Sequence, residues 1–188
     1  MQEVERFYPK NQTEWRQWLQ ENHLSKQSVW LIFYKKKSAQ PTITWSESVD
    51  QALCFGWIDS VKKKLDEERS IQFFSKRKPK STWSKINKAK VDKLIIDGMM
   101  TQAGRDSIEI AKRNGSWTIL DDVEDLIIPN DLEAEFAKNP DTKDCFLSLS
   151  KSVRKMMLYQ IISAKQQATR QKRISEIVEL VSQRMKPK

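Results

Sequence analysis

Six consecutive apolar residues, Val29 to Tyr34, restrict the fold of this 188-residue chain more than any other feature. The run is rich in β-branched and aromatic side chains, and it is far shorter than the ~18 apolar residues that a membrane span needs. A run that is apolar on both faces is typical of a strand in the middle of a sheet. We therefore predict a central strand that ends where residues 35–37, all lysine, enter solvent.

Two more segments, residues 57–61 and 70–74, have the composition of strands. The residues between them, 62–69, are highly charged, as expected at the end of a hairpin that faces water. Helical spacing precedes and follows these segments, first at Trp15, Trp18 and Leu19. The pattern predicts an α+β fold in which a small antiparallel sheet is flanked by helices.

The clearest helix signal begins at Thr44. Thr44 and Glu47 form a capping-box pattern, in which each side chain satisfies a backbone N–H of the other residue. Val49, Ala52 and Leu53 continue at helical spacing. Gly56 follows, where a left-handed residue often ends a helix.

From residue 80 onward the pattern is helical almost throughout. A short helix is expected after Pro129–Asn130, stopped by Asn139–Pro140, and two longer helices close the chain as an antiparallel hairpin. All seven tryptophans lie between residues 15 and 117. This shift in composition predicts an α+β domain over 1–120 and a helical subdomain over 121–188, docked on the first.

The rarer residue types exclude several classes of site. Cys54 and Cys145 are widely separated and form no CxxC pattern, and His23 is the sole histidine. The chain therefore has too few cysteines for a disulfide framework, and its single histidine disfavours histidine-bearing metal sites and Ser-His-Asp catalysis. The charged N-terminal residues lack the apolar stretch of a signal peptide. We expect a cytoplasmic protein with reduced thiols, no membrane span, no metal and no cofactor.

Charge is distributed unevenly along the chain. Residues 121–144 hold nine acidic and two basic residues, whereas residues 61–93 hold twelve basic and four acidic ones. The basic segment mixes cations with aromatic rings that could stack on bases, but it matches no nucleic-acid-binding motif. A solvated surface that keeps the protein soluble explains the same charges.

Two segments contain the candidate functional residues. The first runs from Cys54 to Ser60 and places a thiol, an indole and a carboxylate within a few positions. Asp59 is disfavoured in a strand unless a cation meets it, and Arg77 or Lys78 on the neighbouring strand could do so. An ordinary buried ion pair is the structural alternative, with Cys54 as a small apolar core residue.

The second segment runs from Arg77 to Ser84 and is followed by Asn87. Ser81 or Ser84 is expected to cap the next helix. Its free N-terminal amides, with the two cations of the segment, could also bind an anion.

These segments resemble the bacterial YdeI/OmpD-associated family. The likeness extends from about Trp15 to Val181, and it is carried by residues 43–50, 52–60, 77–84, 87, 98–117, 149–154, 164–165, 169–170 and 173–174. It implies a frataxin-like or YjbR-like N-terminal part, a helical C-terminal segment, protection against bacteriocins or antimicrobial peptides, and association with an outer-membrane porin. It supplies no catalytic residues. Because a porin partner requires export, a cytoplasmic stress role is the expectation for this chain.

We therefore expect a non-enzymatic binding protein with a role in stress or antimicrobial-peptide resistance. Its ligand would be an anion or a partner protein, held near Trp57, Asp59, Arg77, Lys78, Ser81, Trp83 and Asn87. Non-specific nucleic-acid binding through residues 61–93 and the C-terminal basic helices is the alternative. An enzyme built on Cys54 and Asp59 is a third hypothesis, and the oligomeric state is left open.

Overall fold

The structure, a computed structural model, describes residues 4–138 and 140–185 and confirms the predicted α+β class. The chain divides into two compact units, residues 1–117 and 118–188, and each unit has its own hydrophobic core. Within the described residues, no helix has both the length and the apolar character that crossing a membrane requires.

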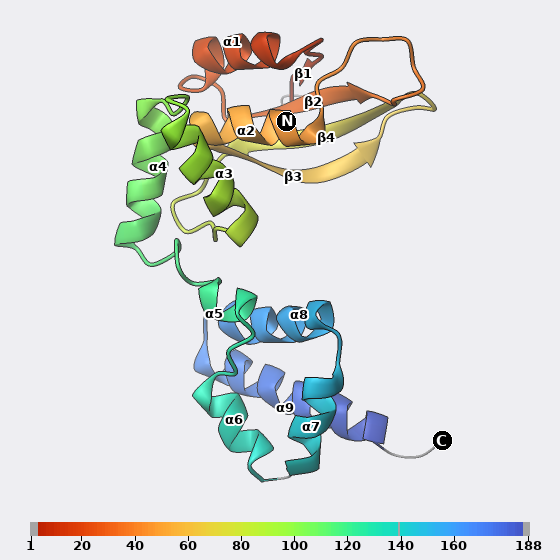
Figure 1. The fold of residues 1–188 in the computed structure, drawn as a ribbon, viewed down its shortest axis with the longest axis vertical. Helices are drawn as coiled ribbons and strands as arrows, with labels where there is room; N and C mark the ends of the chain where they lie inside the picture. Colours follow the sequence, from red (N-terminus) through yellow and green to blue (C-terminus); the bar gives the residue numbers. More distant parts are fainter. Residues whose placement is uncertain (1–3, 139, 186–188) are drawn as a thin grey trace. The chain divides into compact units, whose positions relative to one another are not determined.

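The N-terminal unit is built on a four-stranded sheet with the order β1-β2-β4-β3 (Figure 1). Strand β2 (Ser28–Tyr34) is interior, as predicted, and lies between β1 (Arg6–Phe7) and β4 (Arg69–Lys76). Strand β3 (Trp57–Lys64) pairs with the outer side of β4. The pairing of β1 with β2 is parallel and the other two are antiparallel. Strand β1 was not predicted, because two residues are too few to show a periodic pattern.

Helices α1 (Gln12–Asn22) and α2 (Trp45–Cys54) contribute the core on one face of this sheet. Figure 1 shows α2 in front of the strands. Burial along β2 alternates because successive side chains point to opposite faces: Val29, Leu31 and Phe33 are buried on the helical side. The expected capping box opens α2, with Thr44 and Glu47 bonded reciprocally. The hydrogen bonds from Thr44 lower the pKa of the Glu47 carboxyl.

Two further helices, α3 (Lys85–Ile96) and α4 (Gln102–Arg113), follow the sheet. Helix α4 approaches the end of α2 so closely that a Cβ on Gly104 would lie 2.3 Å from the carbonyl oxygen of Cys54. Thr101, which caps α4, donates its hydroxyl to the same carbonyl oxygen at 2.6 Å. A glycine in this helix is therefore a packing requirement.

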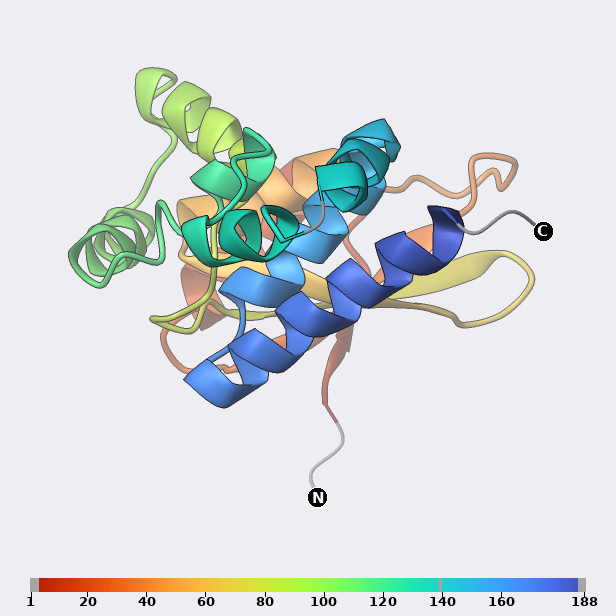
Figure 2. The ribbon, with the colours of Figure 1, turned by 90° about the horizontal axis from the view of Figure 1, so that it is seen from below.

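The C-terminal unit is helical. Its elements are α5 (Asp121–Glu124), α6 (Asn130–Phe136), α7 (Pro140–Ser148), α8 (Lys151–Ile162) and α9 (Gln167–Met185). The core of the unit includes Leu132, Phe136, Phe146, Leu158 and Ile174. Helix α9, dark blue in Figure 2, is fastened to α6 by Arg170, which donates from Nε and Nη2 to the two carboxylate oxygens of Asp131 at 2.5 and 2.9 Å.

Two details of this unit differ from the sequence prediction. Pro140, which we expected only to stop a helix, is the first residue of α7; proline is favoured there because its missing N–H would be unpaired in any case. The helical spacing of the apolar residues at 153, 156, 157, 161 and 164 predicts Met156 on the buried face of α8, but its side chain is 55% exposed. Asn139, the other half of the expected stop signal, lies outside the described residues.

Candidate functional site

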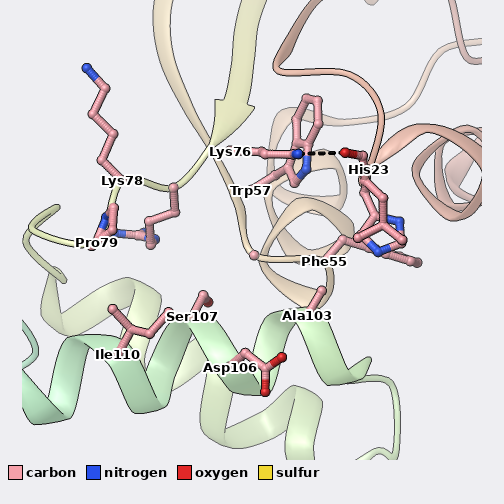
Figure 3. A pocket seen from close by; sticks show the side chains of 13 residues that line it. His23, Phe55, Trp57, Lys76, Lys78, Pro79, Ala103, Asp106, Ser107 and Ile110 are labelled. Atoms are coloured by element: carbon pink, nitrogen blue, oxygen red, sulfur yellow. Dashed lines mark hydrogen bonds between the residues drawn. The ribbon is translucent and has the colours of Figure 1, made fainter.

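A hollow of about 270 Å³ opens in the N-terminal unit, where the end of α1, the start of β3, the end of β4 and helix α4 meet (Figure 3). Its lining is partly apolar and partly charged. The lining residues are His23, Leu24, Phe55, Gly56, Trp57, Lys76, Arg77, Lys78, Pro79, Ala103, Asp106, Ser107 and Ile110. Three of the seven predicted site residues, Trp57, Arg77 and Lys78, are among them.

Backbone contacts set the base of the hollow. Gly56 has φ +70°, and a Cβ there would lie 2.9 Å from the carbonyl oxygen of Ala103. Glycine therefore permits both the turn from α2 into β3 and the approach of α4. The N–H of Arg77 donates to the carbonyl oxygen of Gly56 at 2.9 Å, which aligns the end of β4 with the start of β3.

Arg77 is the most unusual side chain of the site. Its guanidinium carbon lies 3.7 Å from the ring centroid of Trp83, and Nη1 donates to the carbonyl oxygen of Thr82 at 2.9 Å. Nε and Nη2 are buried and have no hydrogen-bond partner among the described residues. Burial lowers the pKa of Arg77 to about 10, an effect that the negative charge of Asp59 partly opposes.

Trp57 and Trp83 are core residues as well as neighbours of the site. Both side chains are almost completely buried, and neither indole Nε1 has a partner in the described part of the chain. The ring of Trp57 packs edge-on against that of Trp18, with centroids 5.8 Å apart. Trp83 does not line the hollow, but it supports the guanidinium that does.

Asp59 is not among the residues that line the hollow. Its carboxylate accepts hydrogen bonds from Trp45 Nε1 at 2.8 Å and from Gln72 Nε2 at 3.0 Å, so the ion pair that we considered with Arg77 or Lys78 does not form. A bulge in β3 between Asp59 and Lys62 shifts the register by one residue, and regular pairing with β4 resumes at Lys62. Asp59 is therefore satisfied by neutral donors and does not reach the hollow.

The remaining predicted residues have separate positions. Lys78 is exposed at the rim, and Ser81 closes a turn by donating its N–H to the carbonyl oxygen of Lys78 at 2.9 Å. Of the two expected caps for α3, the structure uses Ser84, whose hydroxyl accepts from the N–H of Asn87 at 3.3 Å. Ser81 and Asn87 do not line the hollow.

Sequence reasoning missed the contributions of α1 and α4. His23 follows α1, with its ring 5.1 Å from that of Phe55, and Asp106 is an exposed carboxylate on α4 facing the hollow. Lys76 donates to the carbonyl oxygen of Leu24 at 2.8 Å, the dashed bond of Figure 3. Only the spacing on α4, where residues 103, 107 and 110 share a face, could have indicated this wall.

Cys54 offers no nucleophile to the hollow. Its side chain is fully buried, and that burial raises the pKa of the thiol, which disfavours the reactive thiolate. The part of the chain that the structure describes contains no cluster of three or more His, Cys, Asp or Glu residues that could hold a metal ion. The charged side chains that line the hollow are those of Lys76, Arg77, Lys78 and Asp106.

Comparison with known proteins divides the chain in two. No curated protein and no solved structure matches it. Residues 7–107 match the family described as Domain of unknown function (DUF8412), and residues 125–184 match the family described as Bacteriocin-protection, YdeI or OmpD-Associated.

The resemblance to the YdeI/OmpD-associated family, expected over nearly the whole chain, is thus found over the C-terminal helices. A frataxin-like N-terminal part is not supported by these matches and stays a prediction. Because the first match covers more than half of the sequence, the chain belongs to the DUF8412 family of domains of unknown function, and its residues 125–184 are similar to the YdeI/OmpD-associated family.

Proposed function

We propose that the chain is a binding protein whose N-terminal unit holds a small organic anion in the hollow beside Arg77. The observation that carries the proposal is the guanidinium of Arg77, a residue that lines the hollow and has two buried nitrogens without a partner among the described residues. A buried, unpartnered donor costs free energy, and a buried charge costs more. An anion that pairs with Arg77 would offset this cost with charge-assisted hydrogen bonds.

Access to these nitrogens requires a movement of the side chain, because neither is exposed to water. In the proposed complex the guanidinium turns from the carbonyl oxygen of Thr82 toward the hollow that it already lines. The exposed ammonium of Lys78 at the rim adds a second positive charge. Two such cations suit a carboxylate or a phosphate group.

The rest of the hollow limits the size and polarity of the ligand. A volume of about 270 Å³ fits a small molecule rather than a folded segment. Leu24, Phe55 and Ile110 provide apolar contact, and Asp106 would repel a second anionic group on that side. The ligand class is therefore a small molecule with one anionic end and a compact apolar body.

A role in stress or antimicrobial-peptide resistance, exercised in the cytoplasm, is part of the proposal. It is supported by the match of residues 125–184 to a family described as bacteriocin-protecting. In this view the helical C-terminal unit acts with a partner protein, and the N-terminal unit senses the small anion.

Calorimetric titration with phenyl phosphate and with benzoate tests the binding site and distinguishes the two anionic groups. We expect one of the two probes to bind, and Arg77→Met to weaken that binding at least tenfold. Lys36→Gln removes one exposed charge outside the hollow and should leave the affinity unchanged. Absence of binding by both probes, or equal affinities of the wild type and Arg77→Met, would show that Arg77 is only a structural residue.

The biological role is tested separately. Cells that lack the protein are challenged with a bacteriocin after complementation with the wild type, Arg77→Met or Lys36→Gln. We expect the wild type and Lys36→Gln to restore survival and Arg77→Met not to restore it. Survival that is unaffected by loss of the protein would remove the resistance role without affecting the binding result.

A further inference from the structure

The face of the sheet opposite α1 and α2 bears half-buried aromatic rings. By register, the positions that share this face include Trp30, Tyr34 and Phe73, because they alternate with the buried Val29, Leu31 and Phe74. Trp30 and Phe73 are directly opposite each other on the two interior strands, with ring centroids 4.9 Å apart. A second pair, Tyr8 and Tyr34, has centroids 5.0 Å apart.

Cations accompany these rings. Lys63 Nζ lies 5.1 Å from the ring centroid of Trp30, and the guanidinium of Arg69 lies 6.0 Å from that of Tyr34. Arg6 pairs with Trp30 in the register of β1 and β2, which places it on the same face. We call the surface formed by Arg6, Trp30, Lys63 and Phe73 the aromatic face.

The aromatic face is positively charged. Arg69, at its edge, is largely neutralised by Asp66, which lies 2.6 Å from its Nη2. Among the described strand positions that register assigns to this side, none is acidic. The turn end of the β3–β4 hairpin extends beyond the helices of its unit in both views (Figures 1 and 2). Its exposed lysines are accompanied by Asp66, Glu67 and Glu68, so the excess of positive charge on this side lies on the strands and not at the turn. The cations of this face therefore suit a polyanion, and its rings suit flat apolar groups attached to that polyanion.

We propose that the aromatic face binds single-stranded nucleic acid. Aromatic rings on a sheet offer platforms on which unpaired bases stack, and neighbouring cations pair with the phosphates. Lys63 now lies over the ring of Trp30, so a base that stacks there displaces the ammonium toward the adjacent phosphate. A duplex hides its bases and offers only its phosphates, so the face selects single strands.

This inference is independent of the hollow. The hollow is lined from the helical side of the sheet and by α4, and none of its lining residues belongs to the aromatic face. It also differs from charge-driven binding by residues 61–93, because it requires the rings of Trp30 and Phe73.

Fluorescence anisotropy of the full-length chain with a labelled twelve-nucleotide oligothymidine, at several salt concentrations, tests the proposal. We expect the affinity to fall with salt, with a log–log slope of about −1.4 for two phosphate contacts. Trp30→Leu keeps an apolar side chain but removes the stacking surface, and it should weaken binding about tenfold. Lys63→Gln, at an exposed position, should make the slope shallower by about 0.7.

The matched control is the double variant Arg105→Gln/Lys112→Gln, which removes two exposed cations from α4 and should bind as the wild type does. Three results would overturn the proposal: no binding at 50 mM salt, equal affinities of the wild type, Trp30→Leu and Lys63→Gln, or equal affinities for the oligothymidine and a duplex of the same length. Sedimentation of each variant gives a further check. Self-association of the wild type that Trp30→Leu abolishes, without oligonucleotide binding, would instead assign the face to a second copy of the chain.

Discussion

Arg77 combines two properties that conflict in a folded protein, a permanent charge and a buried position with unsatisfied donors. Its neighbours compensate only in part, through the ring of Trp83 and the carbonyl oxygen of Thr82. Asp59, the obvious counter-ion in the sequence, is instead bonded to two neutral donors. A buried charge with unsatisfied donors is typical of a position at which an anionic ligand binds.

This conflict gives a stability prediction. The pKa of Arg77 is lowered in the folded state, so the folded chain disfavours the protonated form that exists at pH 7, and removing the charge removes that penalty. We expect Arg77→Met to lower the free energy of unfolding by no more than about 1 kcal/mol, despite the buried position. Urea denaturation at pH 7 measures this. A loss of several kcal/mol would mean that the guanidinium stabilises the fold and needs no ligand.

Helices and strands could be predicted from the sequence where the residues that define them are close together in the chain. Thr44 and Glu47 lie three positions apart, so their reciprocal bonds could be inferred before any fold was known. The strand over 29–34 is equally clear from its β-branched and aromatic residues, although only alternate side chains of it are buried. The aromatic face could not be inferred, because it depends on the strand order. The spacing of residues on α4 indicates a helix face, but it does not show that this helix returns to the end of the sheet. The pairing of Asp59 was missed for the same reason: Trp45 is fourteen residues away in sequence.

Gly104 shows how closely two elements approach. Replacing a glycine in a helix by alanine normally stabilises by about 1 kcal/mol, but here the new methyl group would lie 2.3 Å from the backbone oxygen of Cys54. We expect Gly104→Ala to destabilise by about 3 kcal/mol or more. Gly98→Ala is the control: it has open space and only the strain of φ +67°, about 1 kcal/mol. Similar unfolding midpoints for the two variants would contradict this account of how α4 packs on α2.

The link between α6 and α9 predicts a pH effect. Hydrogen bonding to Arg170 lowers the pKa of Asp131, so the pair contributes its full stability above about pH 4, the ordinary pKa of aspartate, and loses it as the pH falls through the lower folded value. We expect Asp131→Asn to cost about 2 kcal/mol at pH 7 and clearly less at pH 3. Urea unfolding followed by circular dichroism measures both values. An equal cost at the two pH values would mean that the pair contributes no charge-dependent stability.

At the scale of the whole molecule, the chain joins two cores that share no residue. The same division appears in the charge, because the acidic residues 121–144 lie in the second unit and the basic residues 61–93 in the first. It appears again in the two family matches, which fall on either side of residue 117.

Two separate cores should unfold separately. Leu158 is fully buried in the core of the C-terminal unit, and Leu158→Ala is expected to destabilise that unit by about 2–5 kcal/mol. Tryptophan fluorescence reports only residues 15–117, whereas circular dichroism also reports helices α5 to α9. The variant should therefore shift a dichroism transition and leave the fluorescence transition in place. A joint shift would show that the units unfold as one.

The positions of the two thiols allow the distance between the two units to be followed by energy transfer. Cys54 is sealed in the core, whereas Cys145, in the helical unit, is partly open to solvent. A thiol-reactive acceptor dye would therefore attach to one unit while every indole donor belongs to the other. Energy transfer between them would report how the separation of the two halves changes in solution, without any engineered cysteine.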